Sequence, residues 1–285
     1  MRYNSIALVA AIAIRKSKRG ARRRARECEI MLRIGDLANK SILITGASSG
    51  IGAAISRAFA EQGARIAVHC GSNTEGAERV IQDIRSAGGV AQLVQGDLMR
   101  AGDARRIVED GADILQGLDV LINNAGSLLG RRPFLEADET WVDSVFNLNA
   151  RAVIQTCQAA VPHMIRRGGG AIINVGSIAG LDGGGSGAGI YGAAKAFVHN
   201  LTRHLAREFA AQNIRVNAVS PGVVDTPFHS ATPPERMEAM RKSVPMGRIG
   251  KPSDCVGAFL FLASGHLSGY ITGQNIHVNG GQAMP

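Results

Sequence analysis

The sequence predicts an α/β fold: a doubly wound sheet of about seven parallel strands with helices on both faces, in a single domain. From Ser41 onward, short apolar runs alternate with longer amphipathic stretches, the pattern of repeated βα units. A glycine-rich turn follows the first apolar run and opens a helix. Residues 35–285 contain no linker-like break, so one domain with one core is expected.

The individual elements follow from the same pattern. A helix over 51–62 should end at Gly63, and Asn73-Thr74 offers an N-cap to the next helix. A glycine-rich loop is expected over 182–189. Residues 222–247 hold four prolines among polar residues and interrupt the βα rhythm, so we expect a lid there. The expected strands are 41–46, 65–70, 90–95, 118–122, 171–176, 214–219 and 275–279.

The net charge of +9 is concentrated at the N-terminus. Residues 1–34 hold ten Lys or Arg against two Glu, whereas the remainder holds 22 basic and 21 acidic residues. The folded part therefore shows no nucleic-acid footprint. We expect residues 1–34 to be a disordered basic extension, with Met31 as an alternative start. A transit peptide and a tail that touches lipid or nucleic acid stay open as alternatives.

Composition also excludes several classes of protein. The four cysteines form no Cys-x-x-Cys pair, and the seven histidines show no metal-binding spacing, so we predict no metal site and a reducing, cytoplasmic location. The apolar run 6–14 is too short to span a bilayer, so no membrane span is expected.

The glycine-rich turn predicts a dinucleotide site. Glycines in a strand-to-helix turn let the backbone approach a pyrophosphate, which the helix N-terminus then binds. The same residues match the Gly-x-Ser-x-Gly elbow of serine hydrolases, but that elbow lies deeper in its fold than this first turn. The nucleotide interpretation is therefore favoured. The residues concerned are Gly46, Ser48, Ser49, Gly50, Ile51 and Gly52.

Tyr191 and Lys195 lie one helical turn apart and share a face. An ammonium near a phenol stabilises the phenolate and lowers its pKa, so the pair predicts a proton donor with a tuning group. Alone, the same spacing is also typical of an exposed helix. Ser177, fourteen residues before Tyr191, adds a hydroxyl that could hold a substrate oxygen.

Taken together, the motifs resemble those of the short-chain dehydrogenase/reductase family, which has a Rossmann-type fold. The resemblance covers about residues 37–283 and is strongest to the tetrameric subgroup of β-ketoacyl carrier-protein reductases and sugar or polyol dehydrogenases. It implies an NAD(P)(H)-dependent oxidoreductase and a homotetramer. The matching segments are Thr45 to Gly52, Asp97, Asn123 to Gly126, Asn149, Ser177, Tyr191 with Lys195, Pro221-Gly222 with Thr226, and Gly269 to Gly273.

The resemblance also implies the role of each catalytic residue. Tyr191 would be the acid in carbonyl reduction and the base in alcohol oxidation. Lys195 would lower the phenol pKa and bind the nicotinamide ribose, and Ser177 would hold the substrate oxygen. Asn149 would position a water molecule that links Lys195 to solvent.

The resemblance assigns further residues to the cofactor. Asp97 with the Leu98 amide would contact adenine, and the Asn124 segment would line the adenine ribose. The Pro221 segment would clamp the nicotinamide amide. Besides Tyr191, Lys195 and the glycine-rich turn, these residues are Asp97, Leu98, Asn124, Ala125, Gly126, Pro221, Gly222, Val224 and Thr226.

Cofactor choice depends on the end of the second strand, residues 68–73. NAD enzymes usually carry an acid there, which would repel a 2′-phosphate, and no acid is present. Ser72 and Asn73 could host the phosphate, although the expected Arg or Lys is missing at Ser49 and Gly71. We therefore favour NADP(H) over NAD(H).

The substrate stays open between a 3-oxoacyl thioester or small ketone and a sugar or polyol. The pairs Arg131-Arg132 and Arg166-Arg167 could dock an acyl carrier protein, yet both also fit solvated helix ends. Gln212 stands where carrier-protein reductases should have a basic residue, so this partner is not supported. An alternative of another class is a non-catalytic nucleotide-binding sensor.

Overall fold

Seven parallel strands form one sheet in the computed structural model, which describes residues 33–285. The expected extension 1–34 lies outside these residues except for its last two positions. The strands confirm the predicted number and direction. They are β1 Ser41–Ile44, β2 Arg65–Cys70, β3 Val90–Gln95, β4 Val120–Asn123, β5 Gly170–Val175, β6 Ile214–Pro221 and β7 Asn275–Val278.

The strand order is β3-β2-β1-β4-β5-β6-β7. The order reverses between β1 and β4, which lie side by side with Leu43 opposite Leu121. At such a switch point the loops leave in opposite directions and open a crevice at the carboxyl edge of the sheet. β1 ends earlier than predicted, because Gly46 adopts φ +62° and turns the chain.

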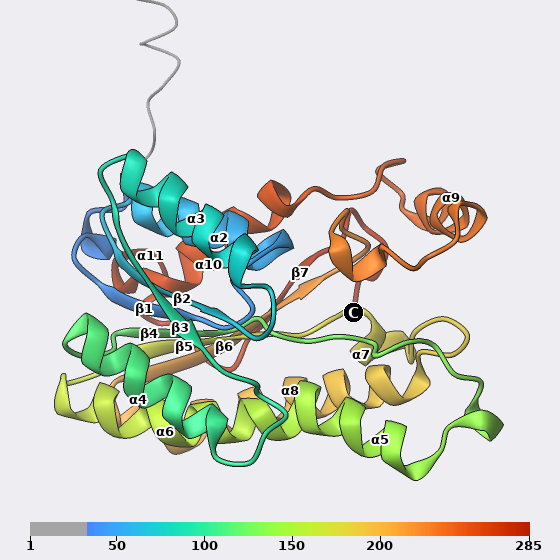
Figure 1. The fold of residues 1–285 in the computed structure, drawn as a ribbon, viewed down its shortest axis with the longest axis horizontal. Helices are drawn as coiled ribbons and strands as arrows, with labels where there is room; N and C mark the ends of the chain where they lie inside the picture. The colour runs from blue at the N-terminus through green and yellow to red at the C-terminus, as the bar shows by residue number, and fades with distance from the viewer. Residues whose placement is uncertain (1–32) are drawn as a thin grey trace, which may run out of the picture. The chain divides into compact units, whose positions relative to one another are not determined.

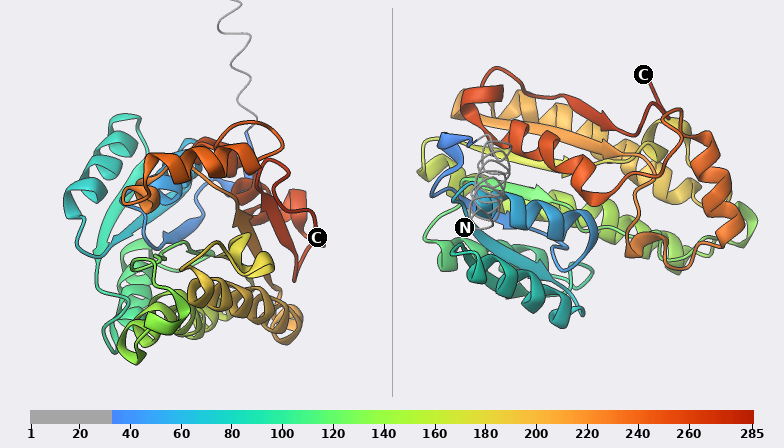
Figure 2. Two further views of the ribbon diagram at one scale, coloured as in Figure 1. Left: turned by 90° about the vertical axis from the view of Figure 1, so that its right-hand side faces the viewer. Right: turned by 90° about the horizontal axis from the view of Figure 1, so that it is seen from above.

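Helices cover both faces of the sheet, as the sequence predicts (Figures 1 and 2). One layer contains α2 Gly50–Glu61, α3 Thr74–Ser86 and α10 Pro252–Ala263, with the short α11 Gly265–Ser268. The other contains α4 Asp103–Leu115, α5 Glu139–Phe146, α6 Ala152–Arg166 and α8 Gly189–Glu208. The shorter elements are η1 Gly35–Leu37, η2 Phe134–Glu136, η3 Asn147–Arg151, α7 Ala179–Asp182, η4 Ala210–Gln212, η5 Pro227–His229 and α9 Pro234–Ser243.

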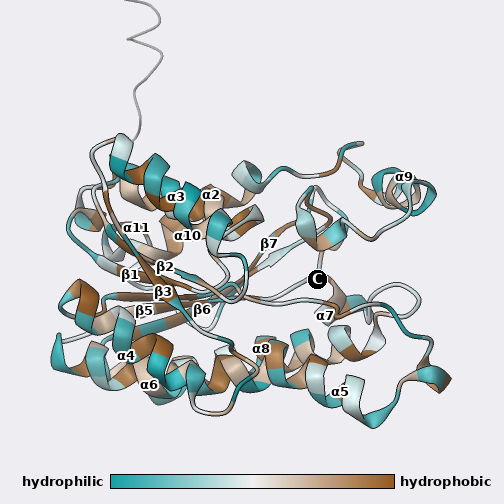
Figure 3. Cartoon of the chain, viewed as in Figure 1, coloured by the Kyte–Doolittle hydropathy of each residue, from teal (hydrophilic) through white to brown (hydrophobic). Residues whose placement is uncertain are grey.

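One core cluster of the described residues lies between the sheet and the layer of α4, α6 and α8. Alternate strand residues supply one wall and the apolar stripes of the helices supply the other, which Figure 3 shows as brown strands above helices that carry both brown and teal residues. Burying one such aliphatic side chain contributes roughly 1.5 to 3 kcal/mol. The cluster includes Leu43, Ala67, Leu121, Ile172 and Val216 from the strands and Ile107, Val153, Met164 and Val198 from the helices.

A buried polar network fixes the central strands against α6 and α8. Asn123 donates to the Asn174 amide oxygen at 2.9 Å and accepts from the Thr156 hydroxyl at 2.7 Å. Asn174 in turn donates to Thr202 at 3.0 Å. These bonds satisfy the amides inside the core and hold the carboxyl ends of β4 and β5 in one register.

The predicted helix boundaries are largely confirmed. The Asn73 side chain accepts from the Gly76 amide at 3.1 Å and caps α3, and Gly63 follows α2 with φ +84°. The expected loop 182–189 is shorter than predicted, because Asp182 closes α7 and Gly189 already begins α8.

The segment 222–247 folds into η5 and α9, which lie beyond the carboxyl ends of the strands (Figure 1). The α9 helix has no buried residue, and its side chains are largely polar. Within residues 33–285, no helix has the length and apolar character needed to cross a membrane.

Candidate active site

A cavity of about 510 Å³ opens at the carboxyl edge of the sheet, next to the β1/β4 switch point. It is lined by the turn after β1, the loop after β4, the end of β5 with α7, the start of α8, and the segment after β6. The lining includes most of the predicted site: Gly46, Ser48, Ser49, Gly50, Ile51, Asn124, Ala125, Gly126, Ser177, Tyr191, Lys195, Pro221, Gly222, Val224 and Thr226.

The glycine-rich turn has a geometry that favours glycine, through positive φ angles and close backbone contacts. Gly46 and Gly50 adopt φ +62° and +53°, and a Cβ at Gly52 would lie 2.4 Å from the Gly46 carbonyl oxygen. The Ser49 side chain makes no capping hydrogen bond, so the first amides of α2 remain available at the cavity wall. This arrangement fits a pyrophosphate.

Gly52→Ala should disrupt this turn, because its Cβ would also lie 2.6 Å from the Asn124 amide nitrogen. We expect weaker binding of reduced nucleotide by at least about tenfold and a loss of roughly 1 to 3 kcal/mol in unfolding free energy. Fluorescence titration and thermal denaturation would measure both. Gly257→Ala is the matched control, since Gly257 lies in α10 with open space around it. Nucleotide binding equal in the two variants would contradict the proposed geometry.

His69 is a positioning residue that the sequence analysis did not identify. Its Nδ1 accepts from the Gly46 amide at 3.1 Å, and its Nε2 lies 3.1 Å from the Gly96 carbonyl oxygen. Burial lowers the pKa of His69 to about 4, so the ring is neutral at physiological pH. A neutral ring with its proton on Nε2 satisfies both bonds and ties the glycine-rich turn to the ends of β2 and β3.

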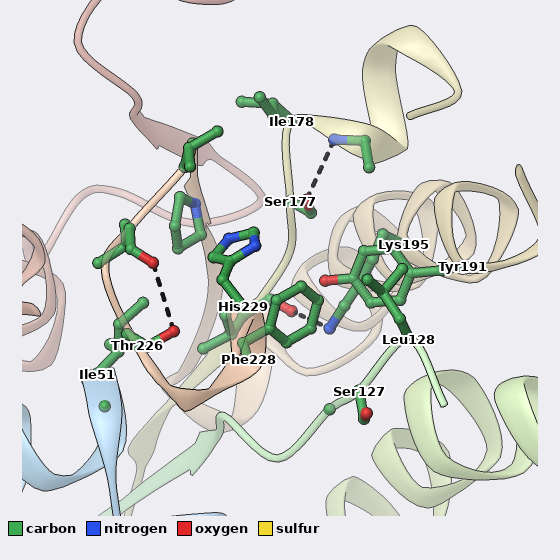
Figure 4. A pocket seen from close by; sticks show the side chains of 18 of the residues that line it. Ile51, Ser127, Leu128, Ser177, Ile178, Tyr191, Lys195, Thr226, Phe228 and His229 are labelled. Carbon is green, nitrogen blue, oxygen red and sulfur yellow. Dashed lines mark hydrogen bonds between the residues drawn. The ribbon is translucent and has the colours of Figure 1, made fainter. Parts of the chain in front are cut away.

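The three central catalytic candidates converge in the cavity (Figure 4). Tyr191 and Lys195 lie on the buried side of α8, and Ser177 follows β5. The Lys195 ammonium donates to the Val175 carbonyl oxygen at 2.8 Å and lies 5.6 Å from the Tyr191 ring centroid. The Ser177 oxygen accepts from the Ala179 amide at 3.1 Å, which leaves its proton for another acceptor.

Burial, more than the pairing, controls the proton affinities. It raises the pKa of Tyr191 to about 12, against an opposing hydrogen bond with Ser177. Burial also lowers the pKa of Lys195 to about 8. Desolvation therefore dominates the pKa of Tyr191 in this arrangement, and the lowering of the phenol pKa by Lys195 stays a prediction. Tyr191 is protonated at pH 7.

Asn149 lies in the π-helical turn η3 and is fully buried. Its amide donates to the carbonyl oxygens of Ser127 and Val145, at 2.8 and 2.9 Å, and its oxygen accepts from the Ser127 amide at 3.1 Å. Both amide protons are thus committed to the backbone. A Cβ at Gly126 would lie 2.8 Å from the Asn149 oxygen and 3.3 Å from the Lys195 nitrogen, so all three residues adjoin.

Several predicted residues do not line the cavity. Gly52 and Asn149 lie behind its wall, and Ser72, Asn73, Asp97 and Leu98 follow β2 and β3 farther along the same sheet edge. The Asp97 side chain accepts from the Met99 amide at 3.0 Å, and Leu98 is buried. The Asn73 side-chain oxygen caps α3. The Asn73 amide nitrogen and the Ser48 carbonyl oxygen both lie within 2.6 Å of the position that a Cβ on Gly76 would occupy.

The lid reaches the catalytic residues. The Phe228 ring lies 5.6 Å from the Tyr191 ring, and His229 follows it in η5 (Figure 4). Gln282, near the C-terminus, donates to Ser243 of α9 at 3.0 Å and so ties the lid to the chain end. Local sequence carries no signal for such long-range contacts. From the sequence, Gly184, Gly185, Phe228 and His229 are expected at the pocket, and all four line it. The lining residues that sequence reasoning did not assign to the site are Ser127, Leu128, Arg131, Val175, Gly176, Ile178, Ala179, Asp182, Ala188, Val223, Pro227, Met240 and Gln282.

The arginines of the pairs 131–132 and 166–167 make different contacts in the structure. Arg167 contacts the buried Asp119 through its Nε at 3.0 Å, so it is a structural residue. Arg132 pairs with Asp138 and stacks over Trp141, whereas Arg131 lines the cavity. Among the described residues, no cluster of three His, Cys, Asp or Glu could hold a metal ion.

The chain is similar to a protein family and to several known proteins. A family model described as Enoyl-(Acyl carrier protein) reductase matches residues 46–283. The 3-oxoacyl-(acyl-carrier-protein) reductase FabG of Staphylococcus aureus is 38% identical over 245 residues, which cover 86% of this chain and 98% of that protein.

Solved structures extend the comparison. The NADH-dependent reductase A1-R′, responsible for alginate metabolism, is 38% identical with a TM-score of 0.81, covering 88% of this chain and 100% of its own. A proposed NAD(P)-dependent gluconate 5-dehydrogenase from Beutenbergia cavernae, with NADP bound at low occupancy, is 34% identical with a TM-score of 0.81. That match covers 87% of this chain and 98% of its own.

Proposed function

The chain belongs to the short-chain dehydrogenase/reductase family and is an NAD(P)-dependent oxidoreductase, and from that premise we propose that it interconverts a carbonyl and a secondary alcohol, with Tyr191 as acid and base. The observation that carries this proposal is the convergence of Ser177, Tyr191 and Lys195 in a cavity walled by a glycine-rich turn. When bound, the nicotinamide cofactor supplies or accepts the hydride.

The proposed roles follow from the state of each side chain. Ser177 donates its hydroxyl proton to the substrate oxygen and orients the carbonyl. Tyr191, protonated at neutral pH, gives its proton to that oxygen as negative charge develops. Lys195 lies close enough to stabilise the phenolate that remains, and burial makes its charge effective. Asn149 holds the loop at Ser127 in place beside Lys195.

The cofactor residues of the proposal divide by position. Gly46, Ser48 to Gly52 and the start of α2 would hold the pyrophosphate, and Asn124 to Gly126 the adenine ribose. Asp97 and Leu98 would contact adenine. Pro221, Gly222, Val224 and Thr226 would hold the nicotinamide amide, while Tyr191 and Lys195 would reach its ribose.

NADP(H) remains the favoured cofactor in this proposal. The end of β2 carries no carboxylate, and Glu75 in the first turn of α3 is paired with Arg79. Ser72 and the Asn73 amide nitrogen are then the groups for a 2′-phosphate. The related proteins are named for both cofactors, one being an NADH-dependent reductase and another having bound NADP.

The proposal also covers assembly, substrate and location. A homotetramer is supported by exposed apolar side chains in the segment that precedes β7 in the chain, with Leu267 47% exposed and Tyr270 fully exposed. A 3-oxoacyl thioester and a sugar or polyol are both retained, because the related proteins include a FabG and a gluconate dehydrogenase. Acyl carrier protein is an optional partner, and a cytoplasmic location is proposed from the cysteine pattern.

Oxidation of NADPH and NADH with β-ketoesters, diketones and ketoses tests this function. We expect turnover of at least one carbonyl class and a higher kcat/KM for NADPH than for NADH. Tight nucleotide binding without turnover of any carbonyl would instead favour the sensor alternative. A clear preference for NADH would overturn the cofactor assignment alone, because the acid–base residues do not depend on the 2′-phosphate.

A further inference from the structure

Two guanidinium groups meet at the mouth of the cavity. Arg131, from the loop after β4, donates to the Ser186 carbonyl oxygen at 3.2 Å, and Arg236 of α9 donates to the same oxygen at 3.0 Å. Arg131 lines the cavity, and the Arg236 guanidinium lies 4.0 Å from a Cβ built on Gly185, another lining residue. The lid segment and the loop after β4 thus bring two positive charges together.

Neither guanidinium has a carboxylate within 4.0 Å among residues 33–285. Their neighbours differ in this respect, since Arg132 pairs with Asp138 and Arg241 pairs with Glu238 on α9. The pKa of Arg131 is lowered by burial and then by the charge of Arg236. Two like charges held on one carbonyl oxygen repel each other, and an anion bound between them would lower that repulsion.

Other charged groups near this mouth do not neutralise the pair. Asp182 lines the cavity, and its carboxylate accepts from the Gly184 amide at 2.8 Å. The pKa of His229 is lowered, first by burial and second by Arg131, while Asp225 opposes the shift. His229 is therefore neutral at pH 7 and adds no positive charge of its own.

We infer that the substrate carries an anionic group, a carboxylate or a phosphate, which Arg131 and Arg236 bind at the cavity mouth while its carbonyl reaches Tyr191. This inference rests on the proposed function. A planar guanidinium fork matches both anions, and binding an anion would release the like-charge contact between the arginines. Because Arg236 belongs to α9, such an anion would also hold the lid over the cavity.

Matched substrates test the inference. The chain would be assayed with 5-keto-D-gluconate, D-fructose 6-phosphate and neutral L-sorbose, with NADPH or NADH. We expect at least one anion to exceed sorbose in kcat/KM by about tenfold or more. Arg131→Gln and Arg236→Gln should each lower that value about 10- to 100-fold, mainly through KM, while changing sorbose less than about twofold. The two anions distinguish a carboxylate site from a phosphate site.

Arg241→Gln is the control, because it removes an equal charge from the same helix at a residue paired with Glu238. It should leave the preference intact. Preference for sorbose or for a neutral acetoacetyl thioester, or equal losses on charged and neutral substrates in Arg131→Gln, would overturn the inference.

A binding measurement separates this inference from the proposed function. D-gluconate should raise the Tm of the protein with NADP⁺ more than sorbitol does, and Arg131→Gln should abolish the difference. If no carbonyl is reduced but this difference is present, the oxidoreductase proposal fails and the anion site stands. If carbonyls are reduced and neither D-gluconate nor D-sorbitol 6-phosphate gives a shift beyond sorbitol, the anion site fails alone.

Discussion

Replacing Tyr191 with Phe is expected to lower kcat for carbonyl reduction by about 10²- to 10⁴-fold, because the ring remains and only the proton donor is removed. The phenol is 8% exposed and its pKa is raised to about 12, so at pH 7 the wild-type group carries the transferable proton. Steady-state kinetics under saturating nucleotide would measure the loss.

Tyr270→Phe provides the matched control, since Tyr270 does not line the active-site cavity and the change keeps the exposed ring that the proposed subunit contact would use. It should leave kcat within about twofold of wild type. Nucleotide affinity should be nearly unchanged in Tyr191→Phe. Undiminished turnover in that variant would show that another group delivers the proton.

Replacing Lys195 with Met is expected to lower kcat/KM by about 10²-fold or more and to change how stability depends on pH. Activity falls because the positive charge near the phenolate is lost. Stability changes because the wild-type ammonium is only 2% exposed and burial lowers its pKa from 10.5 to about 8. A neutral thioether bears no such cost of charge burial.

The sign of the pH effect follows from proton linkage. Below pH 8, Lys195 is charged in both the folded and the unfolded chain, so the folded wild type bears the full cost, about 3 kcal/mol. Between pH 8 and 10.5 the folded state has released its proton while the unfolded state keeps it, so wild-type stability rises with pH.

The unfolding free energy of Lys195→Met minus that of wild type should therefore be about 3 kcal/mol larger at pH 7 than at pH 10.5. The variant is thus relatively more stable at pH 7. Denaturant titrations at the two pH values would measure this, with the exposed Lys242→Met as control. An equal difference at both pH values would mean that Lys195 is not desolvated in the folded protein.

The predicted strands and most helix ends depend on local rules, which explains why they are confirmed. Apolar runs fix buried strands, and Asn73 caps a helix through its own neighbour Gly76. The lengths of the 182–189 loop and of β1 were less well predicted. At these ends, a single turn of helix or one dihedral angle decides the boundary.

The candidate site was predictable where its residues are joined by sequence spacing. Tyr191 and Lys195 share a helix face by spacing alone, and Ser48 to Gly52 form one turn. By contrast, the roles of His69 and Gln282 depend on partners far away in the chain. In the sequence, Arg131 and Arg132 are equivalent members of a basic pair. In the structure, Arg132 pairs with Asp138, whereas Arg131 lines the cavity.

Periodicity and short spacing predict the fold class, the nucleotide-binding turn and the Tyr191–Lys195 pair, because both act locally, whereas the resemblance to the family supplied Asn149 and the role of each catalytic candidate. The protonation of these groups and the charge at the cavity mouth depend instead on long-range contacts. The pKa of Tyr191 rises and that of Lys195 falls because the fold removes water from both. Arg131 and Arg236 meet because the lid folds back over the sheet edge, and the electrostatic cost of that contact depends on distance and burial.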